Sequence, residues 1–494
     1  MPQDSEMDPE VVDDPAYREI IDDALLAIPT MSITSDPDQI FSERGWYDGE
    51  NIEKSVSVEI LYPDDATANH QIDAGIESHS HDRLKRSLRL NFREIYGSAL
   101  FQTDLFERDP VSGDTVADQF NSIFLRGGNN RSWARIWNPD KTAYTIDEFY
   151  RTSQVAMSGY GMRGTFTHLY INGVYWGLYN PVERADDEFH ATYFGGEPED
   201  WFTLNHGGDL SGIDDRYDYL ANRLTRDDLS IDEKYDELQE YLDVDSFIDY
   251  LVISWWTGVS DWPQNNFYGG NRNETSTEGP TPFRYVAWDG EWSWGQGGQS
   301  SSNGRAHVHS DFRASRRGGQ PIARIWHAAR ENDDFMTRFY DRVYRHLFHD
   351  GALTEQNAKD RWMALNDLVR DAVVAESARW GDSMETEGHR TRTRDVDWQR
   401  QVDRILNLMT GNNDYFLRAL RREGYYPELD PPEVSQHGGT VAVGDQLTID
   451  NPNEDGVVYY TTDGSDPRLL GGAVSPAARV IGSGDSITVD GSLT

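Results

Sequence analysis

Two short segments near the middle of the chain place acidic and amide side chains among aromatic residues. In DWPQNNFY, Asp261 is followed by Asn266 at the fifth position after it, and in WDGEWSW, Asp289 is followed by Glu291. Enzymes of phosphoryl transfer use an Asp to accept the proton of the incoming hydroxyl. An Asn at this spacing and a second Asp hold Mg²⁺ on the phosphates. The pattern therefore indicates phosphoryl transfer, with Asp261 as the base.

Two other interpretations of the same residues stay open. Asp and Asn are common turn residues, and the string DWPQNN is rich in turn formers, so this spacing also occurs without any function. A pair of carboxylates, here Asp261 and Glu291, is also what a glycoside hydrolase needs. The residues alone do not choose among the three.

The elements that precede the two segments should position them. The apolar run 247–256 is long enough for a buried helix, which would end shortly before Asp261. Residues 283–288 alternate in polarity and are rich in aromatic and β-branched side chains, which predicts a strand ending at Asp289. One acid thus follows a helix and the other follows a strand.

The two segments resemble the paired motifs of the spore coat protein H (CotH) kinase-like family. Further stretches are similar to the same family, namely LKRSLRLNFREIYG (84–97), FLRGGNNRSW (124–133), GTFTHLYINGVYWGLYNPVERADDEF (164–189) and ESARWGD (376–382). Together these stretches cover about 50–430, so the resemblance does not depend on one motif.

The resemblance implies an atypical protein-kinase fold that phosphorylates protein Ser residues with ATP and a divalent metal, Mg²⁺ or Mn²⁺. Asp261 would be the catalytic base, and Asn266 and Asp289 would be metal ligands. Glu291 would add a metal contact, directly or through a water molecule.

The resemblance also implies a lysine that binds the nucleotide. Lys85, in the basic stretch KRSLRLNFR, would hold the ATP phosphates. Such a lysine requires a carboxylate partner on the following helix. We expect Glu148 to be that partner. Asp147 is the alternative, because one residue turns a helix face by about 100° and the sequence alone does not show which of the two faces inward.

Two more nucleotide contacts are expected. The segment 75–83 stands where ordinary kinases carry a glycine-rich loop, and it departs from the family pattern in containing Glu77 and two His residues. Arg83, at its end, can still cradle a phosphate. Glu183 lies where a kinase hinge would be. We expect it either to meet the nucleotide or to form a structural ion pair.

The order of elements predicts an α+β protein with a two-lobed, atypical kinase-like fold. The predicted strands include the half-buried strand 88–92 and a hairpin around the Asn172-Gly173 turn. Long amphipathic helices follow at 324–348, 361–379 and 396–421. We expect an acidic lead-in at 1–40 and a β-rich N-lobe at 41–184. A helical C-lobe should follow at 185–429, and a small all-β sandwich module at 430–494.

The last module suggests the main alternative to the kinase interpretation. The string YYTTDGSDPR (459–468) resembles the C-terminal β-sandwich module of chitobiases and other secreted glycan-active proteins, which implies contact with glycans. A chain that kept the fold, lost catalysis and used this module would be a non-catalytic surface or scaffold protein.

Composition excludes several classes of partner. The net charge of −41 argues against nucleic acid, whose phosphates need a basic protein face. The acids are spread over the whole chain and lysine is rare, which suits a protein that stays soluble in high salt. The chain contains no Cys, so disulfides and thiolate metal sites are excluded.

Composition also bears on where the protein works. No apolar run approaches a membrane span, and the first residues show no signal peptide. We expect a protein that works outside the cell or at its surface, with a signal peptide already removed. The alternative is a cytoplasmic protein of a salt-adapted organism.

Overall fold

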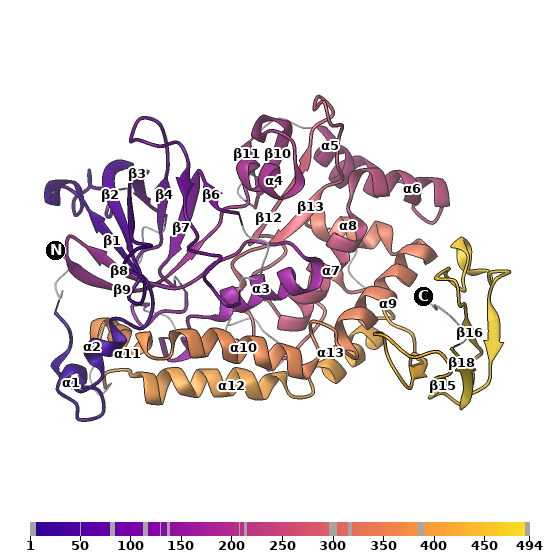
Figure 1. The fold of residues 1–494 in the computed structure, drawn as a ribbon. Coiled ribbons are helices and arrows are strands. Elements are labelled where there is room, and N and C mark those ends of the chain that lie inside the picture. Colours follow the sequence, from indigo (N-terminus) through magenta and orange to yellow (C-terminus); the bar gives the residue numbers. More distant parts are fainter. Residues whose placement is uncertain are drawn as a thin grey trace.

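The chain folds into a mixed α+β structure, as the sequence predicts. The computed structural model describes residues 6–49, 51–79, 84–111, 117–128, 130–135, 139–206, 208–211, 215–295, 304–314, 319–383 and 390–489. A β-barrel occupies one end, helices run along the base and fill the centre, and the last strands lie at the opposite end (Figure 1).

The barrel closes through one parallel strand pair. In sheet order its strands are β1 (Thr30–Thr34), β2 (Lys54–Leu61), β3 (His70–Ser78), β4 (Leu88–Asn91), β7 (Ser122–Arg126), β9 (Val174–Val182) and β8 (Thr167–Ile171). Strands β1 and β8 are parallel, whereas the other neighbours are antiparallel. Strands β8 and β9 form the predicted hairpin, with Asn172 and Gly173 at positive φ (50° and 78°).

The predicted boundary at residue 40 is wrong. Met31 and Ile33 alternate inward on β1 and are fully buried in the barrel core, so the first 40 residues cannot be a separate lead-in. Before β1, the short helices α1 (Pro9–Val12) and α2 (Ile21–Ala24) pack against α11 (Ala372–Trp380). The start of the chain is therefore part of the folded body.

Two buried helices connect the barrel to the rest of the molecule. Helix α7 (Val244–Thr257), the helix predicted at 247–256, has every residue buried except Asp245. It begins where the Asp243 side chain accepts the Ser246 N–H at 3.1 Å, and it ends at Gly258, whose φ of 68° is left-handed. Helix α3 (Ile146–Ser158) packs against it.

The region 185–429 holds a sheet as well as helices. Its four strands, in order, are β11 (Gly208–Ser211), β10 (Trp201–Asn205), β12 (Phe267–Arg272) and β13 (Arg284–Ala287). Only β13 was predicted, at 283–288. Outside this region, in the chain between β4 and β7, β5 (Phe101–Gln102) and β6 (Gln119–Phe120) form a separate two-stranded sheet.

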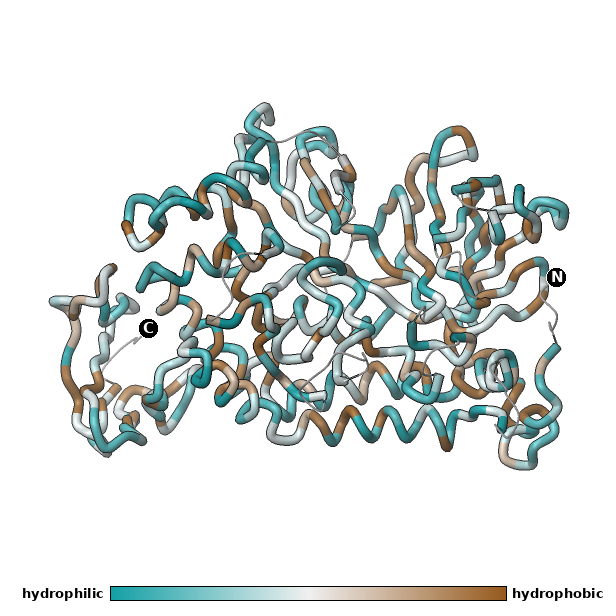
Figure 2. The backbone as a smooth tube through the Cα atoms, turned by 180° about the vertical axis from the view of Figure 1, so that it is seen from behind, coloured by the Kyte–Doolittle hydropathy of each residue, from teal (hydrophilic) through white to brown (hydrophobic). Residues whose placement is uncertain are grey.

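This region also contains further helices, several of which bury one apolar face. They are α4 (Asp187–Phe194), α5 (Asp215–Asp218), α6 (Asp232–Tyr241), α8 (Pro321–Ala329), α9 (Asp333–Leu347), α10 (Glu355–Val369), α12 (Gln399–Met409) and α13 (Asn412–Arg422). Figure 2 shows brown and teal alternating along the lower helices, as expected when one face is buried. On α12, Val402, Ile405 and Met409 form that face. None of the helices in the described parts of the chain is long and apolar enough to cross a membrane.

The C-terminal segment is made of short strands. Strands β14 (Glu433–Val434), β15 (Gln446–Asp450) and β18 (Asp485–Thr488) form one sheet, and β16 (Val458–Tyr460) pairs with β17 (Arg479–Ile481). Its buried apolar side chains in the described residues are Ile449, Val458 and Val489. Exposed contacts tie it to α9, among them Arg468 to Asp341 at 3.4 Å.

Removing residues 430–494 should therefore leave the rest of the chain folded. Exposed ion pairs contribute about 0–1 kcal/mol each, so a chain of 1–429 should melt in one transition within about 5 °C of the parent. Circular dichroism during heating measures this. A broad transition without cooperativity would show that the C-terminal strands belong to the core.

Candidate active site

The two acidic segments meet at one end of the β12–β13 hairpin. Asp261 lies in the loop after α7, and Asn266 immediately precedes β12. Phe267 pairs with Ala287 across the hairpin, so Asn266 and Asp289 both lie just beyond the last pair of this ladder, at the same end of the hairpin. The helix and the strand that the sequence predicts thus deliver their acids to one place.

Asp261 is a buried carboxylate with unused hydrogen-bonding capacity. Its Oδ1 is buried without a hydrogen-bond partner, while its backbone carbonyl accepts the Asn266 Nδ2–H at 3.3 Å. Burial raises the pKa of Asp261 to about 7, and the negative charge of Asp289 adds to the shift. A carboxyl group with a pKa near neutrality is suited to accept a proton.

Asn266 and Asp289 share an uncommon backbone conformation. Both are left-handed, with φ of 65° and 56°, a region that Asn and Asp tolerate better than other side chains. The Asn266 N–H donates to Nδ1 of His206 at 3.2 Å, from the turn between β10 and β11. Nothing in the sequence marks His206, because the β10–β11 hairpin was not predicted.

Arg126, at the end of β7, connects the acids to the barrel. Its Nη2 lies 2.5 Å from Asp289 Oδ1 and 2.7 Å from Glu291 Oε1, and its Nε lies 3.1 Å from Asp147 on α3. The guanidinium also stacks on Trp288 at 4.4 Å. Although burial opposes its charge, the three carboxylates raise the pKa of Arg126 well above the ordinary value.

The sequence analysis quoted Arg126 only inside the motif FLRGGNNRSW. One signal could have identified it: it is the single charged residue of the strand SIFLR, whose other members favour burial. A buried arginine needs carboxylate partners, and the acidic segments supply them.

Glu291 is held in place by the protein itself. Its Oε1 accepts from Arg126, its Oε2 accepts the Asn130 N–H at 2.8 Å, and its backbone carbonyl accepts Nε–H of Arg131 at 3.0 Å. Burial raises its pKa, and the charge of Asp289 adds to that shift. Both carboxylate oxygens of Glu291 thus accept hydrogen bonds from the protein, and its metal contact stays a prediction.

Lys85 does not point at the acids, which corrects its predicted pairing with Glu148. Its Nζ is buried and lies 2.6 Å from both Glu376 Oε1 and the Leu178 carbonyl. Glu376 also accepts the Leu178 N–H at 2.7 Å, so Lys85 joins the barrel to α11.

Helix α3 contributes the alternative acid, Asp147. Its Oδ1 accepts the Gly290 N–H at 2.7 Å, and its other oxygen faces Arg126 and Arg151. Glu148 bonds instead to Arg151 and to Nδ2 of Asn180, the latter at 2.9 Å. Neither of the two acids expected to pair with Lys85 does so, because Asp147 pairs with Arg126 and Arg151, and Glu148 pairs with Arg151.

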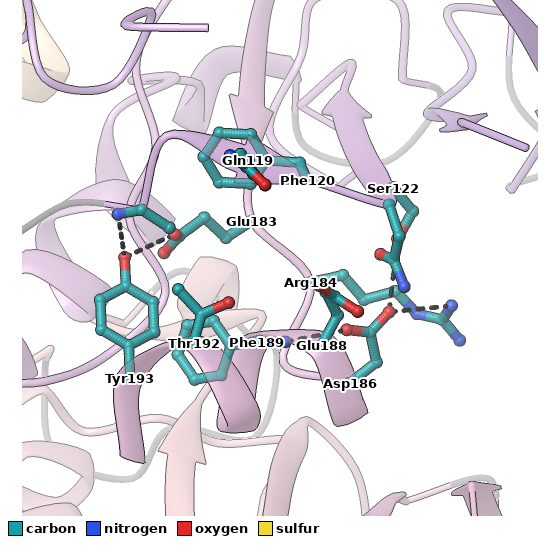
Figure 3. A pocket seen from close by; sticks show the side chains of 12 residues that line it. Gln119, Phe120, Ser122, Glu183, Arg184, Asp186, Glu188, Phe189, Thr192 and Tyr193 are labelled. Atoms are coloured by element: carbon teal, nitrogen blue, oxygen red, sulfur yellow. Dashed lines mark hydrogen bonds and ion pairs between the residues drawn. The ribbon is translucent and has the colours of Figure 1, made fainter. Parts of the chain in front are cut away.

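The last two expected nucleotide contacts have different outcomes. Arg83 lies outside the described residues. Glu183 directly follows β9, where its carboxylate accepts the Tyr193 hydroxyl at 2.6 Å and the Arg163 N–H at 2.7 Å. Burial raises its pKa to about 7. Figure 3 shows Glu183 among the residues that line a small pocket. The cavity volume of this pocket is about 10 Å³.

The residues present fit a metal ion that is shared with phosphates. Within the described ranges, no group of three or more His, Asp or Glu side chains could hold a metal by itself. Asn266 and Asp289 nevertheless bring an amide oxygen and a carboxylate to the same end of the β12–β13 hairpin. Mg²⁺ binds through few protein ligands and takes the rest from phosphates and water.

The comparison with known proteins agrees with this arrangement. A family model described as CotH kinase protein matches residues 156–416, more than half of the chain. The chain belongs to the CotH kinase family. A search of curated proteins gave no match.

The placement of Lys85 predicts a stability effect. Lys85→Met leaves Glu376 buried without its cation, which should lower the free energy of unfolding by about 3–5 kcal/mol. Urea unfolding measures this. The double variant Lys85→Met/Glu376→Leu should recover much of the loss, because it leaves no buried charge unpaired. A Lys85→Met protein of unchanged stability that fails to bind ATP would restore the phosphate-binding role.

The raised pKa of Asp261 predicts a pH-dependent stability. In the folded protein this carboxyl keeps its proton up to a pKa of about 7, against an ordinary 3.8, so parent stability falls as pH rises between these values. In metal-free buffer, Asp261→Asn should be more stable than the parent by about 4 kcal/mol at pH 8 and equal to it near pH 4.

Urea unfolding at both pH values tests this, and Asp455→Asn, an exposed substitution in the C-terminal segment, is the control. A difference between Asp261→Asn and the parent that does not change with pH contradicts the assignment.

Proposed function

We propose that the protein transfers the γ-phosphoryl group of ATP to a protein hydroxyl, that of a Ser, with Mg²⁺ or Mn²⁺. The observation that carries this proposal is the buried, unpartnered Oδ1 of Asp261 beside Asn266 and Asp289. Membership of the CotH kinase family supports it. The family membership alone does not assign the reaction, which is why the geometry matters.

Each residue has one task in this proposal. Asp261 orients the acceptor hydroxyl and takes its proton. The amide oxygen of Asn266 and the carboxylate of Asp289 hold the metal, which neutralises phosphate charge when the nucleotide is bound. Arg126 fixes Asp289 from the barrel side, and Asp147 fixes Arg126 from α3. This pair takes the place that Lys85 and Glu148 were expected to fill.

The geometry disfavours the glycoside-hydrolase alternative. That chemistry needs Glu291 as the second free carboxylate beside Asp261. Both oxygens of Glu291 accept hydrogen bonds from Arg126 and from the Asn130 N–H. Its carboxylate is therefore committed to holding the loop in place.

One observation favours a second candidate, the non-catalytic scaffold. His79 packs on Phe124 at 4.9 Å, and Phe124 packs on Trp288 at 5.3 Å, directly beside Arg126 and Asp289. These aromatic rings take up space next to the acids that a nucleotide base could otherwise use. In the scaffold proposal the protein acts outside the cell or at its surface, and the C-terminal segment contacts glycans.

Two substitutions separate the candidates. Asp261→Asn should bind ATP with Mn²⁺ as the parent does and lose phosphoryl transfer by roughly 10²-fold, the usual scale for a lost acid–base group. Asp289→Asn should lose both, because the charge that anchors the metal is gone. The measurements are transfer from labelled ATP and ATP-dependent thermal shifts with and without EDTA.

Asp455→Asn is again the control and should match the parent in both measurements. If Asp261→Asn transfers phosphate at the parental rate, the base is assigned wrongly. If the parent neither binds ATP nor transfers phosphate with either metal at low or high salt, the scaffold function replaces this proposal.

A further inference from the structure

A second arginine of the site, Arg131, has one guanidinium nitrogen without a hydrogen-bond partner. Arg131 belongs to the loop after β7 and is only 3% exposed. Its Nε donates to the Glu291 carbonyl at 3.0 Å and its Nη1 donates to the Asn130 carbonyl at 2.9 Å. Its Nη2 is buried and has no hydrogen-bond partner. A buried guanidinium nitrogen without a partner is costly, so it calls for an explanation.

The unpartnered acceptor of the site belongs to Asp261. Burial lowers the pKa of Arg131 to about 10, although the nearby charges of Glu291 and Asp261 act to raise it, so Arg131 stays charged at neutral pH. The site therefore holds a charged donor, Nη2 of Arg131, and an acceptor, Oδ1 of Asp261, both buried and unpaired. One missing group that accepts from the first and donates to the second would satisfy both atoms.

A hydroxyl and the phosphoryl group that it attacks would together make these two contacts. Its proton faces a base, and the oxygens of the phosphoryl group in transfer carry negative charge and accept hydrogen bonds. We propose that Arg131 is a catalytic residue, whose Nη2 binds an oxygen of the phosphoryl group during its transfer. This inference rests on the proposed function and adds a residue to it.

The step balances without any further reactant. The bond between phosphorus and the bridging oxygen of the β-phosphate breaks, and that oxygen leaves on ADP with the electron pair. The bond between phosphorus and the Ser oxygen forms, and the Ser proton moves to Asp261. Arg131 keeps all of its protons and contributes charge and one hydrogen bond.

The surroundings of Arg131 make it suited to this task. Two backbone carbonyls fix the plane of its guanidinium, and the ring of Trp292 covers it at 5.4 Å. Nη2 is thereby aimed before any substrate arrives, and a preorganised donor is worth more than a mobile one. Arg126 does not have this freedom, because Nε and Nη2 of that residue already bind three carboxylates.

The test compares Arg131→Gln with Arg404→Gln. Arg404 is a nearby arginine that donates to the Trp294 carbonyl at 2.7 Å and also has a buried nitrogen without a partner, Nη1. Its loss therefore controls for removing a cation and an unpaired donor from the region. Arg131→Gln should lower kcat for transfer from ATP by roughly 10²-fold, the usual scale for one lost donor of this kind, and leave KM for ATP within about threefold. Arg404→Gln should keep kcat within about threefold.

A transition-state mimic gives a readout that a merely structural role would not change. ADP, Mn²⁺ and aluminium fluoride together should stabilise the parent far more than ADP and Mn²⁺ do, and Arg131→Gln should lose only the part due to fluoride. If the Gln variant does not fold, Arg131→Lys serves instead. It keeps the charge, shortens the reach, and should lose at least about tenfold in kcat.

The outcomes distinguish the role of Arg131 from the proposed function. An active parent whose Arg131→Gln variant keeps its kcat and its fluoride-dependent stabilisation overturns the role of Arg131 and leaves the proposed function intact. A parent without ATP binding or transfer overturns the proposed function, and the role of Arg131 with it. An equal loss in Arg404→Gln would show that general loss of positive charge causes the effect.

Discussion

The contact on which the site depends is the buried ion cluster around Arg126. One guanidinium joins β7 of the barrel, α3 through Asp147, and the segment after β13 through Asp289 and Glu291. Taking these charges out of water is expensive, and only close pairing with good geometry offsets the cost. The barrel, the central helix and the hairpin must therefore hold their relative positions, because any shift would leave a buried charge unpaired.

Asp261 is the acid that this cluster leaves out. Arg126 contacts its neighbours Asp289 and Glu291, and Asp261 stays in their negative field without a cation of its own. Burial first, and then the charge of Asp289, raise its pKa to about 7. The same arrangement that pairs Asp289 with Arg126 thus makes Asp261 a better proton acceptor, at some cost in stability.

The sequence predicts local features of this site well and its long-range partners poorly. The apolar run before Asp261 and the alternating strand before Asp289 are local patterns, and both elements form where they were predicted. The partner of Lys85 lies 291 residues away, and Asp289 and Glu291, two of the three carboxylate partners of Arg126, lie 163 and 165 residues away. Periodicity places a side chain on one face of its element, but it cannot show which distant element covers that face. For the same reason β1 looked like a lead-in, since its partners β2 and β8 lie further along the chain.

Lys85 and Arg126 have different kinds of partner because the two cations respond differently to burial. Burial lowers the pKa of Lys85, whereas the carboxylates around Arg126 raise its pKa despite burial. An ammonium is a compact point charge, so Lys85 suits a contact with one carboxylate and one carbonyl. A planar guanidinium presents several donors and can bind three acids at once, and it keeps its charge in a dry site. A site that gathers Asp147, Asp289 and Glu291 around one buried cation therefore requires an arginine.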